Sequence, residues 1–86
     1  MTTGFETANL SNLPTIDLRA TGEQIRRLRT KASISVRDLS RAMYLADVQS
    51  VYRWQRGVSL PSLENLVLLS WLLGVPIEKI LVIEFK

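Results

Sequence analysis

Apolar residues recur along most of this chain at the three- and four-residue spacing that marks one face of an α-helix. Residues 15–19 instead alternate between polar and apolar, which is a weak strand pattern. The pattern as a whole predicts five helices, at residues 21–32, 35–43, 47–56, 62–73 and 76–81.

The ends of these helices carry residues that suit helix termini. Side chains of Ser, Thr and Asp accept the free N–H groups of a first turn, and glycine adopts the left-handed conformation that often follows a last turn. Thr21 followed by Gln24 forms a capping-box pattern, and Pro76 suits a first helical position. The expected caps at the starts are Thr21, Ser35, Asp47 and Ser62, and the expected stops are Gly57 and Gly74.

The predicted elements form one all-α domain, a compact five-helix bundle, at residues 21–82. An N-terminal arm, residues 1–20, starts with a polar leader at 1–14, and a short tail spans residues 83–86. Residues 82–86 fit either a frayed helix end or a short strand. In the strand alternative the arms are extended, and Ile16 and Leu18 are the expected partners. The expected core residues of the first three helices are Ile25, Leu28, Ala32, Val36, Leu39, Met43, Val51 and Trp54.

The third predicted helix has a polar, basic outer face. At about 100° per residue, four of its side chains fall within one sector, and Val51 and Trp54 fall on the opposite side. A short helix with such a face matches the size and chemistry of the major groove of DNA. The four residues of this sector are Gln49, Tyr52, Arg53 and Arg56.

Positive charge is concentrated in the same part of the chain. Residues 19–56 hold nine Lys or Arg against three Asp or Glu, a net charge of +6, whereas the rest carries −3 and the whole chain +3. A localised positive field suits a polyanionic partner. The alternative interpretation of the charge alone is a basic face that only keeps the protein in solution.

Several classes of protein are disfavoured by what the sequence lacks. It contains no cysteine and no histidine, which removes disulfides, thiolate sites and the usual general base. The acidic residues form no recognisable pair or metal site, and the glycines are isolated. We therefore expect no enzyme, metal, cofactor or small-molecule ligand. Without a signal peptide or a long apolar run, we expect a soluble cytoplasmic protein with no membrane partner.

Several short motifs together resemble the Cro/repressor type of helix-turn-helix DNA-binding domain, also called xenobiotic-response-element-like. The resemblance runs from about Gly22 to Leu81, and five segments carry it: residues 25–29 (IRRLR), 35–39 (SVRDL), 52–57 (YRWQRG), 61–66 (PSLENL) and 73–76 (LGVP). It implies a lambda-repressor-like five-helix bundle that binds operator DNA, usually as a dimer.

The resemblance also implies roles for particular residues. The third helix would lie in the major groove, with Val48, Gln49, Ser50 and Arg53 at the positions that contact bases. Glutamine pairs with adenine and arginine with guanine, and each such pair discriminates by about 1–3 kcal/mol. The expected contacts to the DNA backbone are Arg37, Arg41, Tyr52 and Arg56. The chain departs from the family at Val36, where glutamine is frequent, and at Tyr44 and Leu45, where glycine is frequent.

The fourth predicted helix is apolar on more than one side. Its core face would consist of Leu63, Leu66, Val67, Leu69, Ser70 and Leu73, which leaves Leu68 and Trp71 on the other side. An apolar patch rimmed by polar groups suggests an interface. We hypothesise that Leu68, Trp71 and Leu72 bury against a second copy of the chain or against one of the arms.

These observations favour a sequence-specific transcription regulator that binds double-stranded DNA and represses by occupying it. The alternative is a protein-interaction module, an antitoxin or adaptor, that uses the apolar fourth helix or the arms.

Overall fold

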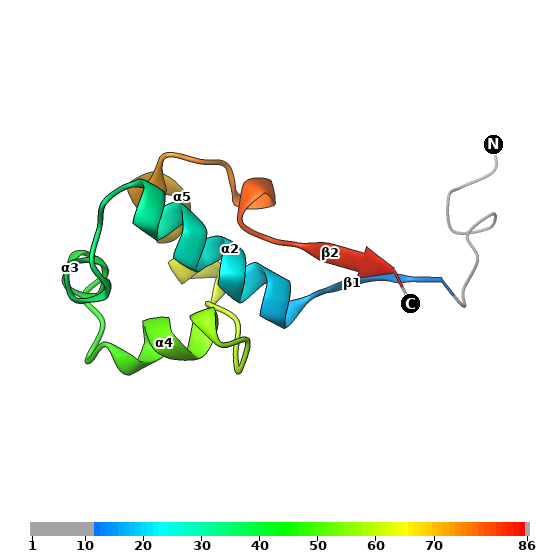
Figure 1. The fold of residues 1–86 in the computed structure, drawn as a ribbon, viewed down its shortest axis with the longest axis horizontal. Helices are drawn as coiled ribbons and strands as arrows, with labels where there is room; N and C mark the ends of the chain where they lie inside the picture. Colours follow the sequence, from blue (N-terminus) through cyan, green and yellow to red (C-terminus); the bar gives the residue numbers. More distant parts are fainter. Residues whose placement is uncertain (1–11, 86) are drawn as a thin grey trace.

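A computed structural model describes residues 12–85 of the chain. They form four α-helices, a short 3₁₀ helix and two short strands (Figure 1). In chain order these are β1 (Pro14–Ile16), α2 (Leu18–Lys31), α3 (Val36–Ala42), α4 (Gln49–Gln55), α5 (Leu63–Leu73), η1 (Ile77–Lys79) and β2 (Ile83–Phe85). The expected polar leader lies outside the described residues up to residue 11, and so does Lys86 of the tail.

Helix α2 begins earlier than its sequence pattern predicts. Its cap is Asp17, whose Oδ1 accepts a hydrogen bond from the Ala20 backbone N–H at 2.9 Å. The expectation of a start at Thr21 is therefore wrong. Buried Thr21 instead accepts the Val82 N–H through its Oγ1 at 2.9 Å, and Gln24 Nε2 donates to the Lys79 carbonyl at 2.8 Å. Both residues of the capping-box pattern thus tie α2 to the C-terminal segment.

Other helix ends follow the predicted chemistry. Ser35 Oγ accepts the Asp38 N–H at 3.0 Å, and Ser62 Oγ accepts the Asn65 N–H at 3.2 Å. Gly74 ends α5 with φ +68°. Asp47 lies one residue before the cap position of α4, which is Val48, but its carboxylate still accepts the Gln49 N–H at 2.8 Å.

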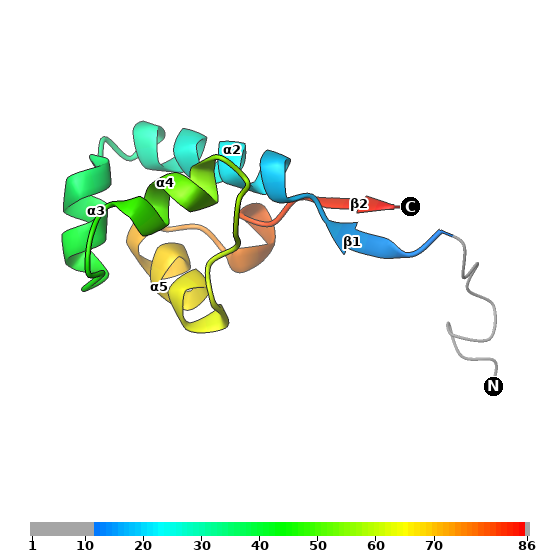
Figure 2. The ribbon, with the colours of Figure 1, turned by 90° about the horizontal axis from the view of Figure 1, so that it is seen from below.

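The core is built where α2 packs on α4, α3 meets α4, and α5 meets η1 (Figures 1 and 2). The expected inward positions of α3 and α4 are confirmed, whereas Ala32 is exposed at the end of α2. The buried apolar residues are Ile25, Val36, Leu39, Met43, Val51, Trp54, Leu66, Leu69 and Ile80.

The two strands form an antiparallel ribbon in which Ile16 pairs with Ile83 and Pro14 with Phe85. Figures 1 and 2 both show it at the end of the molecule opposite α3. The strand alternative for the tail is therefore confirmed, although Leu18, expected in the partner strand, opens α2.

The expectation of a mostly helical bundle with extended arms is confirmed, but the count of five α-helices is wrong. The described residues include the ribbon, and the predicted helix at 76–81 is only the 3₁₀ helix η1. Its Ile80 N–H reaches the Ile77 carbonyl three residues back. The described part of the chain has no helix that is long and apolar enough to cross a membrane.

Candidate nucleic-acid interface

Helices α3 and α4 form a helix-turn-helix unit joined by residues 43–48. Tyr44 adopts φ +55° in this turn, a left-handed conformation that disfavours a bulky residue. The Leu45 N–H donates to the Ser40 carbonyl at 3.0 Å and closes the end of α3. Glycine would adopt this backbone conformation without strain, whereas Tyr44 adopts it at an energetic cost.

Helix α4 has one buried and one exposed face, as its sequence predicts. Val51 and Trp54 are buried, whereas Gln49 and Arg53 are exposed to solvent. Arg53 Nη2 lies 3.4 Å from Ser50 Oγ, a long hydrogen bond that leaves the guanidinium available to another partner. The arrangement therefore presents an amide and a guanidinium, one helical turn apart, on the outside of the molecule.

The other expected base-contacting residues are less accessible. The side chain of Val48 is half-buried against the core, and Ser50 is also half-buried. Of the four candidates, Gln49 and Arg53 therefore offer polar groups on the exposed face, and Val48 and Ser50 are partly accessible at its start.

The expected backbone contacts lie around the same unit. Arg37 and Arg41 are exposed on α3, four residues apart, and Arg56 is exposed directly after α4. Tyr52 is 41% exposed on α4. Within residues 12–85 none of the three arginines makes a side-chain hydrogen bond or ion pair, so their donors are free for phosphate oxygens.

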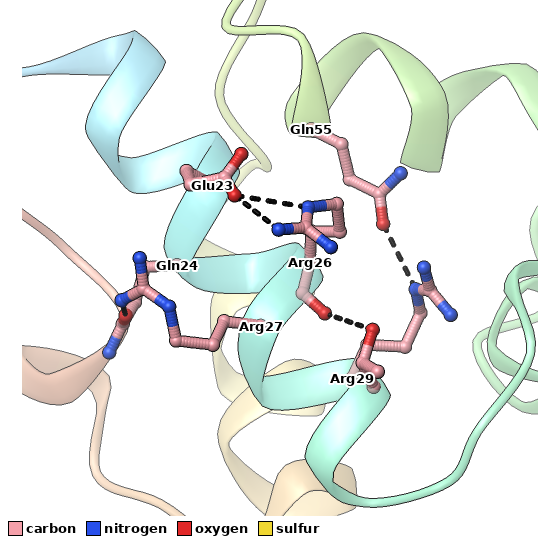
Figure 3. Close-up of polar contacts among 7 residues, drawn as sticks. Glu23, Gln24, Arg26, Arg27, Arg29 and Gln55 are labelled. Carbon is pink, nitrogen blue, oxygen red and sulfur yellow. Dashed lines mark hydrogen bonds and ion pairs between the residues drawn. The ribbon is translucent and has the colours of Figure 1, made fainter.

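A half-buried arginine holds α4 in place. Arg29 Nε donates to Gln55 Oε1 at 2.9 Å (Figure 3). Arg29 Nη1 donates to the Ile34 carbonyl at 2.8 Å. One guanidinium therefore connects α2, the loop before α3, and the end of α4. The sequence pattern places Arg29 beside the apolar stripe of α2, and that position was the available signal for a bracing role.

Helices α2 and α4 approach each other closely at Gly22. A Cβ atom added there would lie 2.1 Å from the Trp54 carbonyl oxygen and 2.7 Å from that of Gln55. Only a residue without a side chain allows this backbone-to-backbone contact. Sequence reasoning missed this role, although an isolated glycine inside a helical pattern is a known sign of close packing.

Ion pairing on the outer face of α2 is local. Glu23 and Arg26 form an ion pair in which the guanidinium donates to the carboxylate, and Arg27 Nη1 donates to Gln24 Oε1 at 2.8 Å (Figure 3). The hydrogen bond from Arg26 lowers the pKa of Glu23, and the same bond raises the pKa of Arg26. Arg26 and Arg27 therefore bind side chains of their own helix. Within residues 12–85, Arg37, Arg41 and Arg56 have no such side-chain partner.

The apolar surface of α5 differs from the expected one. Leu63, Val67 and Trp71, spaced four residues apart, are exposed, and Trp71 is 83% exposed. We call these three residues the α5 stripe. The expectation that Leu63 and Val67 face the core is wrong, whereas Leu68 and Leu72 are half-buried and pack against the core.

This geometry defines a class of protein: a helical domain with a basic helix-turn-helix unit on its surface. Comparison with known proteins identifies the family. A family model described as helix-turn-helix matches residues 25–80. The chain therefore belongs to the helix-turn-helix family, in its Cro/repressor type, which comprises DNA-binding transcription regulators.

Solved structures show the same fold. The crystal structure of the DNA-binding domain of BldD matches with a TM-score of 0.65 and 21% identity, covering 77% of this chain and 94% of that one. The BldD DNA-binding domain of S. venezulae gives the same TM-score and identity, with 97% of that chain covered. A search of curated proteins found no significant match.

Proposed function

We propose that this protein is a sequence-specific regulator that inserts α4 into the major groove of double-stranded DNA and represses transcription by occupying its site. The observation that carries the proposal is the orientation of α4: Arg53 and Gln49 are exposed while Trp54 is buried in the core. Membership in a DNA-binding family supports it. The α4 face is the part of this surface that offers donors and acceptors suited to base edges.

The proposed roles of the individual residues follow from the chemistry of their side chains. The Arg53 guanidinium donates two hydrogen bonds to the O6 and N7 atoms of guanine, and the Gln49 amide pairs with adenine. Val48 and Ser50 contribute contacts at the start of α4. Arg37, Arg41, Tyr52 and Arg56 bind phosphates and fix the register of the helix without reading sequence.

The test is selection of bound duplexes from a random DNA pool, followed by titrations with Arg53→Ala and Gln49→Ala. Loss of one bidentate pair costs about 1–3 kcal/mol. In each variant, the ratio of the affinity for the selected site to the affinity for an unrelated duplex should therefore fall roughly 10- to 100-fold. Lys79→Ala, which removes an exposed charge from η1, is the matched control. Unchanged base preference in both α4 variants would refute the assignment of base contacts.

We further propose that the protein binds DNA as a homodimer through the α5 stripe, with Trp71 at one end of the stripe and Leu68 and Leu72 beside it. Support comes from an exposed tryptophan flanked by exposed aliphatic side chains, a surface that is costly to leave in water. A dimer predicts a two-fold symmetric site with half-sites about 34 Å apart. With about four phosphates neutralised per subunit, log affinity should fall with log salt at a slope of roughly −7.

Sedimentation equilibrium of the wild type and of Trp71→Ser tests this arrangement. We expect a dimer that weakens in the variant while the variant stays folded, because Trp71 makes little contact with its own core. A wild-type protein that stays monomeric at high concentration contradicts the homodimer.

The α5 stripe also favours a second candidate function, a protein-interaction module such as an antitoxin or adaptor. The two functions are compatible, because the stripe lies on α5 and the basic face on α4. A wild-type protein with no sequence preference on DNA would leave this second function as the better one.

A further inference from the structure

The first turn of α2 and the last turn of α4 enclose a shallow hollow that the proposed contacts do not account for. It is lined by Asp17, Arg19, Glu23, Gln55, Arg56 and Gly57. Arg56 is a proposed phosphate contact, whereas Arg19 has been assigned no role. Two exposed guanidinium groups from different helices therefore border one depression in the surface.

Backbone contacts fix Arg19 relative to α4. A Cβ atom added to Gly57 would lie 2.8 Å from the Cα of Arg19 and 3.0 Å from its backbone nitrogen. One turn further along α2, Gly22 makes the similar close approach to Trp54. Two glycines thus allow the start of α2 to lie directly against the end of α4, which places the backbone of Arg19 beside that of Gly57, the residue after Arg56.

Some of the charged side chains around the hollow have hydrogen-bond or ion-pair partners, and others have none. Asp17 caps α2 through its Oδ1, and the carboxylate of Glu23 is paired with Arg26. Within residues 12–85, Arg19 and Arg56 have no hydrogen-bonding or ion-pairing side-chain partner. Both guanidinium groups therefore keep their N–H donors available for an anion placed between them.

The length of helix between Gln49 and Arg56 indicates which anion would lie between Arg19 and Arg56. Arg56 follows Gln49 by seven residues, which is about 10 Å of helix. The major groove is about 12 Å wide. When Gln49 and Arg53 face the bases, the end of α4 therefore lies at the edge of the groove, where the sugar-phosphate backbone runs.

We propose that Arg19 and Arg56 together form a clamp for one DNA backbone phosphate at the end of α4, so that α2 contributes directly to DNA binding. The inference rests on the proposed function. Guanidinium groups bind phosphate oxygens with paired, charge-assisted hydrogen bonds, and two of them on one phosphate fix its position from both sides.

The experiment measures the affinity of a labelled duplex carrying the selected site at KCl concentrations between about 50 and 300 mM. Arg19→Ala should weaken binding about tenfold, equally for selected and unrelated duplexes. It should also reduce the magnitude of the log–log salt slope, by less than about 0.9 per subunit because Arg56 still contacts the same phosphate. Arg19→Lys should keep the slope, because the charge remains.

Lys79→Ala is the matched control, since it also removes one exposed positive charge. Lys79 lies in η1, which Figure 1 shows above α2 while α4 lies below it. This variant should bind like the wild type. Thermal unfolding at low salt serves as a second readout: Arg19→Ala should be about as stable as the wild type, because the exposed Arg19 side chain has no internal partner within residues 12–85.

The outcomes distinguish the clamp from the proposed function. If Arg19→Ala keeps the wild-type salt slope while Arg53→Ala loses base preference, the clamp is refuted and the proposed function stands. If the wild type binds duplexes without base preference but Arg19→Ala still lowers the slope, the proposed function fails and the phosphate contact is supported.

Discussion

Replacing Gly22 by alanine tests whether the position of α4 depends on a backbone contact. The added Cβ would lie 2.1 Å from the Trp54 carbonyl oxygen and 2.7 Å from that of Gln55, distances that real Cβ contacts do not reach. Both neighbours are main-chain atoms, so neither can rotate aside. Helices α2 and α4 must therefore move apart by about 1 Å to restore an ordinary contact.

The magnitude follows from two opposing effects. Alanine favours a helix over glycine by about 0.8–1.0 kcal/mol. Overpacking of a fitted contact costs about 1–3 kcal/mol, and we expect the upper end because the obstacle is backbone. The net loss in the free energy of unfolding should be about 2 kcal/mol, which lowers the melting temperature of a domain this size by about 10 °C.

Urea and thermal unfolding measure this loss, and Gly74→Ala provides the comparison. Gly74 has φ +68°, but a Cβ there meets no atom within 4 Å, so its substitution carries only the conformational cost of about 1–2 kcal/mol. Gly22→Ala should also weaken DNA binding under conditions where it is folded, because α4 is displaced, whereas Gly74→Ala should bind normally. A Gly22→Ala protein as stable as the wild type would refute the close contact.

Three further substitutions probe single features. Tyr44→Gly should raise the free energy of unfolding by about 0.5 kcal/mol in urea titrations, since the residue is 94% exposed at positive φ and left-handed strain outweighs the flexibility of glycine; a decrease would contradict this. Ser40→Ala should raise the free energy of unfolding by about 1 kcal/mol, because within residues 12–85 the buried Ser40 Oγ has no hydrogen-bond partner. A loss of stability would mean that this Oγ does have such a partner. Gln55→Glu should strengthen the bond from Arg29 by about 1 kcal/mol at neutral pH. Because Arg29 lowers the pKa of the new carboxyl, this gain should disappear as the pH falls below about 4, and a gain independent of pH would exclude the ion pair.

Features set by short-range rules could be predicted from the sequence. The cap of α3 depends on Ser35 and Asp38, three residues apart, and the inward and outward faces of α4 follow from helical geometry. The exposure of Arg53 opposite buried Trp54 belongs to the same class. The helix-turn-helix unit could therefore be predicted from the local sequence pattern alone.

Features set by long-range contacts could not be predicted in this way. Thr21 and Gln24 form a valid capping-box pattern, but their side chains bind Val82 and Lys79, which are more than fifty residues away. Asp17, just before the predicted start, then caps the helix. The side chains of Thr21 and Gln24 could form either a capping box or tertiary hydrogen bonds, and in the structure they form the tertiary hydrogen bonds.

The α5 stripe illustrates a different limit. Eight of the eleven residues of α5 are apolar, so the sequence contains too little contrast to identify the buried face. Leu66 and Leu69 are buried, whereas Leu63 and Val67, assigned to the same face, are exposed. Only the packing of other elements, such as η1, against α5 decides which apolar side chains remain in solvent.

The residues proposed to contact DNA and those that hold them belong to separate sets, and this separation has a consequence for mutation. Arg53 and Arg37 are exposed and have at most one weak internal bond, so their removal should reduce DNA binding without reducing stability. Arg29 and Gly22 lie between helices, so changes there alter the position of α4 and should reduce both. A plot of affinity against unfolding free energy should therefore divide the variants into two groups, and a single correlated line would mean that α4 is held by the core alone.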